Sequence, residues 1–424
     1  MKVLISAIAC DPHGISEGLH GWMACRSLST LADLWLIVSG EMRPGIEKAQ
    51  ATGDIPDNMH FTYIGENKPY HPNRMVARFE GWFRYMKFNR QILPVAQELH
   101  KRVGFDLAQH VTYSTWRVGC PLWRLGIPLI WGPISGTEVF PLGKLGGTLS
   151  LKSYAFEVVR KMGGVFSYLS PEVHQSARNS FHIIAAHREA VPFLAKLRKS
   201  PEGISVLSYY SFSPDRFDAT SRKSFPVREA RPLKIFASGN LEGRKGVAIA
   251  LRGLRMAKDQ GVKFAYRITS RGPEFDHLNV LAGKLGLADE VSLGQRFPRD
   301  GYIQELWDTD IYLLPSLREG GGLSMMEAMV AGCVPIVADC GGPGTAVTDE
   351  CGVRIPVASM EKMAADISAA IVRLDKNRAL LAKMGEAAQK RIIDNYSEQR
   401  FISSMKNVYN LALAGRTSAA PQTS

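Results

Sequence analysis

The chain has 424 residues, 45% of them hydrophobic and 22% charged, which is typical of a soluble globular protein and long enough for two domains of similar size. No apolar run reaches the roughly 18 residues that span a bilayer, which argues against an integral membrane protein. The net charge of +12 favours an anionic partner, but no recognisable nucleic-acid motif is present, so we expect no nucleic-acid partner.

The first half alternates short apolar runs with helical patterns, which predicts a parallel doubly wound α/β sheet. The start, Met1 to Cys10, has one basic residue and no clear cleavage site, so we interpret it as a first strand rather than a signal peptide. A helix is predicted over Gly18 to Leu31. The predicted strands of this half are Val3–Ala9, Leu34–Val38, Phe105–His110, Ile127–Trp131 and Phe181–Ala185.

The same alternation restarts after a segment, Pro201 to Pro232, that is rich in Ser, Pro and charge. A helix is predicted over Val247 to Lys258. Two tandem Rossmann-like domains therefore face a cleft, with ligands at the carboxyl ends of the strands. The predicted strands of this half are Leu233–Ala237, Phe264–Thr269, Val291–Leu293, Ile311–Leu314 and Val334–Ala338.

These patterns set the expected domain boundaries. We assign the N-terminal Rossmann-like domain to residues 1–205, a linker to 206–232 and the C-terminal Rossmann-like domain to 233–395. A C-terminal helix at about 396–413 is a candidate to pack back on the first domain. The small, polar residues 415–424 are expected to be disordered.

The charge and cysteine patterns add two expectations. Residues 1–200 carry 23 basic and 15 acidic side chains (+8), and the remainder carries 29 and 25 (+4), so the first half holds most of the excess. The six cysteines are scattered without zinc or disulfide spacing, which favours the reducing cytoplasm.

The most informative stretch is a glycine-rich turn between a predicted strand and a predicted helix, Leu323 to Ala331. Such a turn presents backbone N–H groups at a positive helix terminus and suits a diphosphate. The carboxylates of Glu319 and Glu327 flank it and can accept hydrogen bonds from sugar hydroxyls. Phosphate and sugar together suggest a nucleotide sugar. The three glycines are Gly320, Gly321 and Gly322.

A second glycine-rich turn carries two adjacent cations, Arg244 and Lys245, among Gly239, Gly243 and Gly246. Lysine acts as a point charge and arginine as a fork, so the pair suits the two phosphates of a departing diphosphate. The plainer interpretation is a solvated surface turn.

Four ordered motifs resemble those of glycosyltransferase family 4, a bacterial-type family of retaining enzymes with the GT-B fold. The match is strongest from Ile235 to Val347 and looser in the first half, at Ala9 to Gly18 and Gly132-Pro133. The four motifs are Gly239-Asn240-Leu241-Glu242-Gly243-Arg244-Lys245-Gly246, Ser270-Arg271-Gly272-Pro273, the Glu-x7-Glu pair from Glu319 to Glu327, and Cys340-Gly341-Gly342-Pro343.

The resemblance implies transfer of a sugar from a nucleotide-diphosphate sugar to an acceptor hydroxyl, in glycan, polysaccharide or glycolipid biosynthesis. By resemblance, Glu319 contacts the sugar hydroxyls, Glu327 accepts from the ribose, and Arg271 and Pro273 border the nucleobase. Gly321 replaces the family's usual aromatic residue. The donor-binding residues are further expected to include Gly239, Asn240, Gly272, Gly320, Gly322, Leu323 and, from the first half, Gly18.

Three residues of the first half are further candidates. His110 ends a predicted strand where the family often places a histidine near the sugar, and a structural histidine is an equal alternative. Ser16 and Glu17 are expected to face the acceptor. Glu17 either orients the acceptor hydroxyl or stabilises the start of the following helix.

The segment Arg74 to Arg90 intersperses basic residues with aromatic residues and methionines at helical spacing. A basic aromatic helix can lie in a membrane interface, which would place the protein peripherally on the inner face of the cell membrane. The default interpretation is a helix that faces the core and keeps its basic side in solvent.

No metal-binding constellation is apparent, and Asp308 and Asp310 are taken as structural. We therefore expect no metal cofactor, with Arg244, Lys245 and the helix terminus compensating the diphosphate charge. Two rival functions remain, a nucleotide-sugar epimerase on the same fold and a non-catalytic module of glycan assembly. The donor, base, acceptor, linkage and oligomeric state are not indicated.

Overall fold

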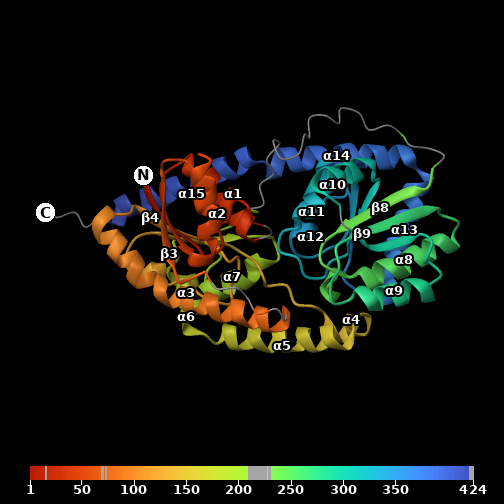
Figure 1. Cartoon of the computed structure of the whole chain (residues 1–424), viewed down its shortest axis with the longest axis horizontal. Helices are drawn as coiled ribbons and strands as arrows, with labels where there is room; N and C mark the ends of the chain where they lie inside the picture. Colours follow the sequence, from red (N-terminus) through yellow and green to blue (C-terminus); the bar gives the residue numbers. More distant parts are fainter. Residues whose placement is uncertain are drawn as a thin grey trace. The chain divides into compact units, whose positions relative to one another are not determined.

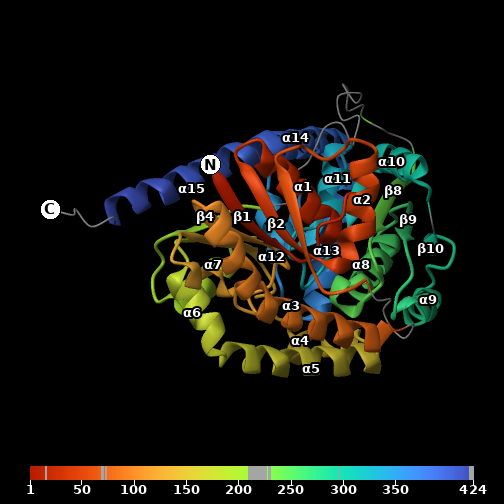
Figure 2. The same ribbon diagram turned by 60° about the vertical axis from the view of Figure 1, so that its left-hand side comes forward.

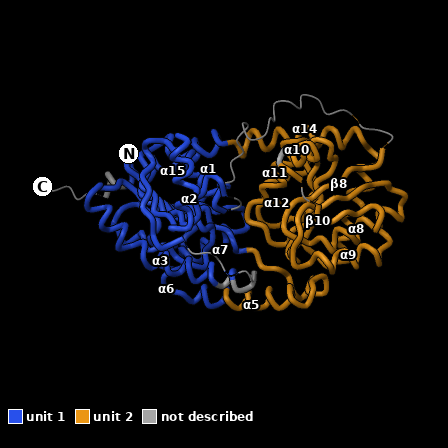
Figure 3. The backbone as a smooth tube through the Cα atoms, viewed as in Figure 1, with its two compact units in different colours: residues 1–137, 164–211, 398–424 blue, residues 138–163, 212–397 orange. Residues whose placement is uncertain are grey.

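The computed structural model describes residues 1–14, 17–67, 71, 74–208, 227, 231–295 and 297–419. The chain divides into two compact units (Figure 3). Unit 1 holds residues 1–137, 164–211 and 398–424, and unit 2 holds residues 138–163 and 212–397. Each unit has its own parallel sheet with helices on both faces, which confirms the predicted α/β class with two doubly wound domains.

The sheet of unit 1 has seven strands in the order β3-β2-β1-β4-β5-β6-β7. Figure 2 labels three neighbouring strands of this sheet, β4, β1 and β2. Its strands are β1 (Lys2–Ala7), β2 (Asp33–Ser39), β3 (Met59–Ile64), β4 (Leu107–Thr112), β5 (Leu129–Ile134), β6 (His182–Ala185) and β7 (Ile204–Val206). Its helices are α1 (Glu17–Ser29), α2 (Arg43–Ala51), α3 (Arg74–Val103), α6 (Pro171–Asn179), α7 (Ala190–Arg198), α15 (Glu398–Ala419) and the last part of α5 (Leu151–Tyr168).

Both faces of this sheet are buried, as the near-continuous apolar strands require. Along β1, Leu4 packs in the cluster that includes Tyr85 of α3, whereas Val3 and Ile5 pack with Tyr409 of α15 on the other face. The Tyr409 hydroxyl donates to Gln109 Oε1 at 2.6 Å, which ties α15 to unit 1.

The strand predictions in unit 1 need correction at four strands. β5 covers Leu129–Ile134 rather than Ile127–Trp131. β4 covers Leu107–Thr112 rather than Phe105–His110. The residue before the strand, Asp106, accepts a hydrogen bond of 2.8 Å on its carboxylate from the backbone N–H of Lys2. The strands β3 and β7 were not predicted. β3 has only two fully buried residues and β7 is three residues long, so neither shows the strong apolar run of the central strands.

The sheet of unit 2 has six strands in the order β10-β9-β8-β11-β12-β13. Figure 1 labels two neighbouring strands of this sheet, β8 and β9. Its strands are β8 (Leu233–Ser238), β9 (Phe264–Thr269), β10 (Val291–Gln295), β11 (Ile311–Leu313), β12 (Val334–Ala338) and β13 (Val353–Ile355). Its helices, besides the first part of α5, are α4 (Leu142–Leu145), α8 (Val247–Asp259), α9 (Phe275–Lys284), α10 (Arg299–Asp308), α11 (Leu323–Val330), α12 (Gly341–Ala346), α13 (Met360–Lys376) and α14 (Arg378–Tyr396).

The segment 138–163 lies in unit 2, although the sequence placed it in the first domain. Polar contacts explain the difference. The buried Glu274 carboxylate accepts from the hydroxyls of Ser150 and Ser153, and the guanidinium of Arg318 pairs with Glu157 at 2.6 Å. The predicted linker falls mostly outside the described residues, at 209–226 and 228–230. Residues 420–424 of the predicted tail also lie outside them, whereas 415–419 belong to helix α15, so the disorder predicted there was wrong.

In unit 2 the order of the strands reverses between the neighbours β8 and β11. Ligands of open parallel sheets bind outside the carboxyl ends of the strands at such a switch point. The turns that follow β8 and β11 are therefore brought together by topology alone, and they are the two glycine-rich turns that the sequence singled out.

Candidate functional site

One glycine allows the turn after β8 to pack closely against the turn after β11. A short 3-10 helix, Gly243–Lys245, ends at Gly246, whose φ is 69°. A Cβ at Gly246 would lie 2.2 Å from the carbonyl oxygen of Pro315, so only glycine allows this approach. The contact is closed by a hydrogen bond of 2.8 Å from the backbone N–H of Leu317 to the carbonyl of Arg244.

This approach builds a compact cluster of charges. The ammonium of Lys245 donates to Glu319 Oε2, and Arg244 Nη1 donates to the same oxygen at 3.2 Å. Arg244 Nη1 also donates to the carbonyl of Arg318 at 2.8 Å, and its Nε donates to Glu242 Oε2 at 2.7 Å. These four charged side chains are only 10–21% exposed, so solvent screens them weakly.

The cluster is ionised at neutral pH. Burial alone would raise the pKa of Glu319, but the positive charges of Lys245 and Arg244 and their hydrogen bonds outweigh it and lower that pKa to about 2. Burial would lower the pKa of Arg244, but Glu319 and Glu242 outweigh it and raise that pKa. The cations and carboxylates therefore hold each other in one geometry.

The other glycine motif, Cys340 to Pro343, supports the loop that carries Glu319. The backbone N–H of Gly342 donates to the carbonyl of Glu319 at 2.9 Å. A Cβ at Gly342 would lie 2.5 Å from the carbonyl oxygen of Gly320, and one at Gly341 would lie 2.3 Å from that of Glu319. These glycines let two backbones approach closely and fix the position of the carboxylate.

Helix α11 begins at Leu323, directly after the three glycines. Its N-cap residue, Gly322, has φ of 83° and makes no side-chain capping hydrogen bond. The backbone N–H groups of the first turn are thus left without a side-chain cap, as an anion site at a helix terminus requires. Gly320 and Gly321 lie in the loop that leads to this turn.

Glu327 lies on α11 and is half-buried, which is less than the buried setting that its apolar neighbours predicted. Its Oε2 accepts a hydrogen bond of 2.8 Å from the hydroxyl of Tyr302 on α10. Burial and the charge of Glu327 raise the pKa of Tyr302, so this hydroxyl stays a donor. Sequence reasoning missed Tyr302, since nothing in its spacing links it to a residue 25 positions later.

Sequence reasoning also missed a second network of hydroxyl groups, which joins β8, β11 and α11. The hydroxyl of the buried Tyr312, on β11, donates to the carbonyl of Ser238 at 3.2 Å and lies 2.8 Å from Ser324 Oγ. Ser324 Oγ in turn donates to the same carbonyl at 3.2 Å. These bonds tie the end of β8 to the start of α11, which fixes the helix terminus relative to the basic turn.

The remaining predicted donor residues of unit 2 lie in the turns after β8 and β9. Asn240 follows Gly239 and donates to Glu242 Oε1 at 3.2 Å. A Cβ at Gly272 would lie 2.4 Å from the carbonyl oxygen of Leu241, so Gly272 is required for packing of the two turns.

The other two residues of that motif, Arg271 and Pro273, are exposed. The guanidinium of Arg271 stacks on the ring of Phe275 at 4.4 Å. The nucleobase role predicted for Arg271 and Pro273 stays a prediction.

In unit 1, His110 is buried, with 1% of its surface exposed. Its Nε2 lies 3.1 Å from the carbonyl oxygen of Tyr113 and must carry the proton, because a carbonyl only accepts. Its Nδ1 lies 3.1 Å from the hydroxyl of Ser6. Both ring nitrogens are engaged inside the unit, which favours the structural alternative for this residue.

The other first-half candidates lie at the start of α1. The carboxylate of Glu17 accepts from the backbone N–H of Ser114 at 2.9 Å and from its hydroxyl at 3.1 Å, which ties α1 to the loop after β4. The carbonyl of Gly18 accepts from the N–H of Asp11 at 2.8 Å. Ser16 lies outside the described residues.

The burial of His110 has a consequence for stability. Burial lowers the pKa of His110 from 6.5 to about 4, so between these values the unfolded chain binds more protons than the native one. We expect the free energy of unfolding to fall by up to about 3 kcal/mol as pH drops from 6.5 to 4. Urea titrations of the wild type and His110→Gln across this range measure it.

In those titrations His110→Gln should lose this part of the pH dependence. A matched change at the exposed His60 on β3 should leave it intact. The same slope in His110→Gln as in the wild type would contradict the buried neutral state.

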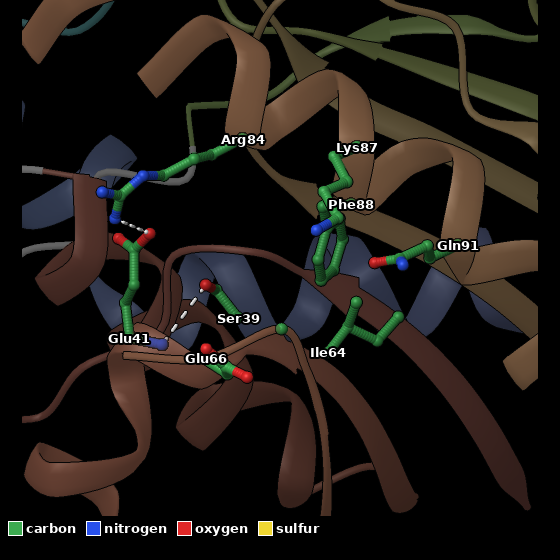
Figure 4. A pocket seen from close by; sticks show the side chains of 9 residues that line it. Ser39, Glu41, Ile64, Glu66, Arg84, Lys87, Phe88 and Gln91 are labelled. Atoms are coloured by element: carbon green, nitrogen blue, oxygen red, sulfur yellow. Dashed lines mark hydrogen bonds and ion pairs between the residues drawn. The ribbon is translucent and has the colours of Figure 1, made fainter. Parts of the chain in front are cut away.

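A separate pocket of about 240 Å³ lies on unit 1 (Figure 4). Arg84 and Glu41 face each other at its edge in an ion pair of 2.7 Å. None of the predicted catalytic, donor or acceptor residues lines it, although Arg84 and Lys87 belong to the basic segment Arg74–Arg90. The lining residues are Ser39, Glu41, Ile64, Gly65, Glu66, Arg84, Lys87, Phe88 and Gln91.

In its described part, this basic segment of α3 turns Tyr85 and Phe88 into the core and leaves Phe83 exposed. The side chains of residues 74–76, 78 and 79 lie outside the described set. The described part agrees with the default interpretation of a core-facing helix with a basic outer side.

Comparison with known proteins follows this geometry. Residues 219–391 match the family model described as Glycosyl transferases group 1. A curated relative from Escherichia coli K12, named as the colanic acid biosynthesis glycosyltransferase WcaL, is 27% identical over 275 residues, or 63% of this chain and 65% of that one. The amylovoran biosynthesis glycosyltransferase AmsK of Erwinia amylovora is 27% identical over 193 residues, or 44% and 45%. The alignments thus span less than two thirds of either relative.

Among solved structures, Anabaena HepE in complex with UDP and glucose superposes with a TM-score of 0.59 at 15% identity, over 97% of this chain and 99% of that one. The chain has the GT-B fold. In GT-B terms, units 1 and 2 are the two Rossmann-like domains that the sequence predicted. The group 1 match and the names of the curated relatives support the predicted class of enzyme, a transferase of sugars.

Proposed function

We propose that this chain is a retaining, family 4 type glycosyltransferase that moves a sugar from a nucleotide-diphosphate sugar to an acceptor hydroxyl. The observation that carries the proposal is the cluster of Arg244, Lys245 and Glu319 at the switch point of unit 2, beside the N-terminus of α11. The relatives WcaL and AmsK, with names from colanic acid and amylovoran biosynthesis, support a role in polysaccharide assembly.

In this proposal the cluster compensates the charge of the leaving diphosphate. The acceptor oxygen forms a bond to the anomeric carbon as the carbon–oxygen bond to the β-phosphate breaks, and the acceptor proton passes to an oxygen of the leaving phosphate. Negative charge then grows on the diphosphate, where Lys245, Arg244 and the N–H groups of α11 stabilise it. The acceptor oxygen attacks the anomeric carbon from the same face that the diphosphate leaves. The anomeric configuration is therefore retained, and no enzymic nucleophile is needed.

Glu319 has two parts in this scheme. It fixes both cations before the donor binds, since its carboxylate contacts each of them. Its loop also ends at the three glycines, so the carboxylate is placed to accept from hydroxyls of the donor sugar. Because its pKa is about 2, it remains an acceptor throughout the physiological pH range.

The nucleoside half of the donor is assigned to the neighbouring helix. Glu327 accepts from the ribose hydroxyls, and Tyr302 fixes the orientation of that carboxylate through the bond of 2.8 Å. Arg271 and Pro273 border the base. Compensation by Arg244 and Lys245 makes a resident metal unnecessary in this scheme.

In unit 1, Glu17 and Ser16 are retained as acceptor contacts and Gly18 as a donor contact. His110 is assigned a positioning role through the carbonyl of Tyr113, since its ring is buried. The reaction is placed in the cytoplasm, where nucleotide sugars are the co-substrate.

The donor is identified by thermal shift with the diphosphate sugars of uridine, guanosine and adenosine. A ligand that binds only the native state stabilises it by RT ln(1 + [L]/Kd), about 2.7 kcal/mol at a hundredfold excess over Kd. We expect the diphosphate sugars of one of these nucleosides to raise the Tm of the wild type by several degrees and that of Lys245→Ala by much less.

No shift with any of these donors would refute the proposal and revive a non-catalytic module. Conversion of the bound donor to a different sugar without an acceptor would instead indicate an epimerase.

A further inference from the structure

Helix α5 presents an apolar stripe to solvent. Six large apolar side chains of α5, and Leu169 directly after it, are between 42% and 84% exposed: Leu151, Tyr154, Val159, Met162, Val165, Phe166 and Leu169. At about 100° per residue, they occupy an arc of about 140° on one side of the helix. Scattered exposed apolar residues are ordinary in proteins, whereas a continuous stripe of this kind marks an interaction surface.

The rest of α5 shows that the helix is inverted relative to an ordinary amphipathic helix. Its one carboxylate, Glu157, is buried and forms an ion pair of 2.6 Å with Arg318. The hydroxyl of Ser153 donates to the buried Glu274. The polar side thus faces the protein and the apolar side faces out, so the stripe is not the packing face of α5.

Two lysines border the stripe. At about 100° per residue, Lys152 and Lys161 fall about 20° beyond its two opposite edges, and both are exposed. Apolar residues flanked by lysines on both sides are the pattern of a helix that lies in a membrane interface, where the lysine stems extend to the headgroups. α5 offers no exposed carboxylate that could complement these lysines in a second copy of the chain.

We propose that the stripe of α5 inserts into the interfacial region of a membrane that contains anionic lipid. The apolar side chains enter the boundary between headgroups and acyl chains, and Lys152 and Lys161 contact the lipid phosphates. The net charge of +12 adds a long-range attraction to such a surface. None of the helices in the described part of the chain is long and apolar enough to cross a bilayer, so contact is peripheral.

Co-sedimentation of the full chain with lipid vesicles tests this proposal. Vesicles of phosphatidylcholine with about 30% phosphatidylglycerol should pellet the wild type. The double variant Met162→Glu/Phe166→Glu should lower the bound fraction about tenfold or more, since each carboxylate would have to enter the interface. Lys152→Gln/Lys161→Gln should lower binding to the anionic vesicles specifically and leave weak binding to phosphatidylcholine unchanged.

The matched control places the same two charges on exposed apolar positions elsewhere, Val280→Glu on α9 and Leu411→Glu on α15. This control should bind vesicles like the wild type. Circular dichroism and Tm check that every variant is folded. A Phe166→Trp variant gives a second readout that does not depend on weakened binding. The fluorescence emission of the new tryptophan should shift to the blue when anionic vesicles are added.

Three results would overturn the proposal. One is equal vesicle binding by the stripe variant and its control. Another is an unshifted emission of Phe166→Trp in vesicles that pellet the protein. The third is a dimer in analytical ultracentrifugation that the stripe variant dissociates while the wild type ignores vesicles, which would assign the stripe to a second copy. None of these readouts depends on transferase activity.

Discussion

Replacing Lys245 with alanine is expected to lower kcat for sugar transfer by about 10²–10³-fold. Lys245 is the least exposed member of the cluster, and its ammonium contacts Glu319 in the loop that follows β11. Charge on the departing diphosphate grows in the transition state, so an ammonium beside it stabilises that state more than the bound donor. Most of the loss should therefore appear in kcat rather than in KM.

The control for this measurement is Lys258→Ala on α8, in the same unit. Lys258 forms an ion pair of 2.6 Å with Glu290 and has no part in the site, so its removal should leave kcat unchanged. Steady-state kinetics of both variants, with Tm to show that they are folded, make the comparison. A Lys245→Ala enzyme with kcat within about threefold of the wild type would remove Lys245 from the mechanism.

Replacing Glu319 with glutamine is expected to lower kcat by about 10²-fold and to destabilise unit 2 by about 3 kcal/mol. The glutamine keeps the shape of the side chain and removes the charge that holds Lys245 and Arg244. Lys245 then loses this ion pair while it is mostly buried, which is costly, whereas Arg244 keeps its ion pair with Glu242. Urea denaturation measures the loss of stability. Assays of sugar transfer, under conditions in which the variant is folded, measure the loss of kcat.

The pH dependence separates this ion cluster from a simple hydrogen bond. The native pKa of Glu319 is about 2, below the ordinary value of 4.5. Its stabilising contribution is therefore complete above pH 4.5 and is lost as the pH falls toward 2. Glu319→Gln should lack this part of the acid destabilisation. The control Glu98→Gln, at an exposed pair with Arg102, should keep it. An unchanged acid profile in Glu319→Gln would contradict the assigned cluster.

The glycine-rich turns could be predicted because their cause is local. Gly246 and Gly322 take positive φ angles, and Gly272 and Gly342 leave room for another backbone. Each of these glycines lies in a short sequence motif, close to a charged residue of the same turn. The central strands were predicted for a similar reason, since both faces are buried and the apolar runs are nearly continuous.

The partners of these residues could not be predicted, because they come from elements distant in the chain. Tyr302 reaches Glu327 from a neighbouring helix, and Tyr312 joins Ser238 at the end of β8 to Ser324 on α11. No spacing rule relates such residues before the order of the strands is known. The placement of residues 138–163 in unit 2 depends on similar distant contacts, between Ser150 and Glu274 and between Glu157 and Arg318.

The two long amphipathic helices show a different limit. The pattern of Arg74–Arg90 drew attention to α3, whose described aromatic residues Tyr85 and Phe88 are buried. α5 has a stronger apolar stripe, yet it faces outward because a buried ion pair holds its polar side. Periodicity indicates that a helix has two sides, but the side that faces the protein is decided by contacts from elsewhere in the fold.

A crystal structure of the full chain with the diphosphate sugar that raises Tm most would test the central claim directly. The account predicts diphosphate oxygens within about 2.7–3.1 Å of Lys245 Nζ and of the first N–H groups of α11, with the ribose at Glu327. A diphosphate bound elsewhere, for example beside Arg84 and Lys87 in the pocket of Figure 4, would contradict it.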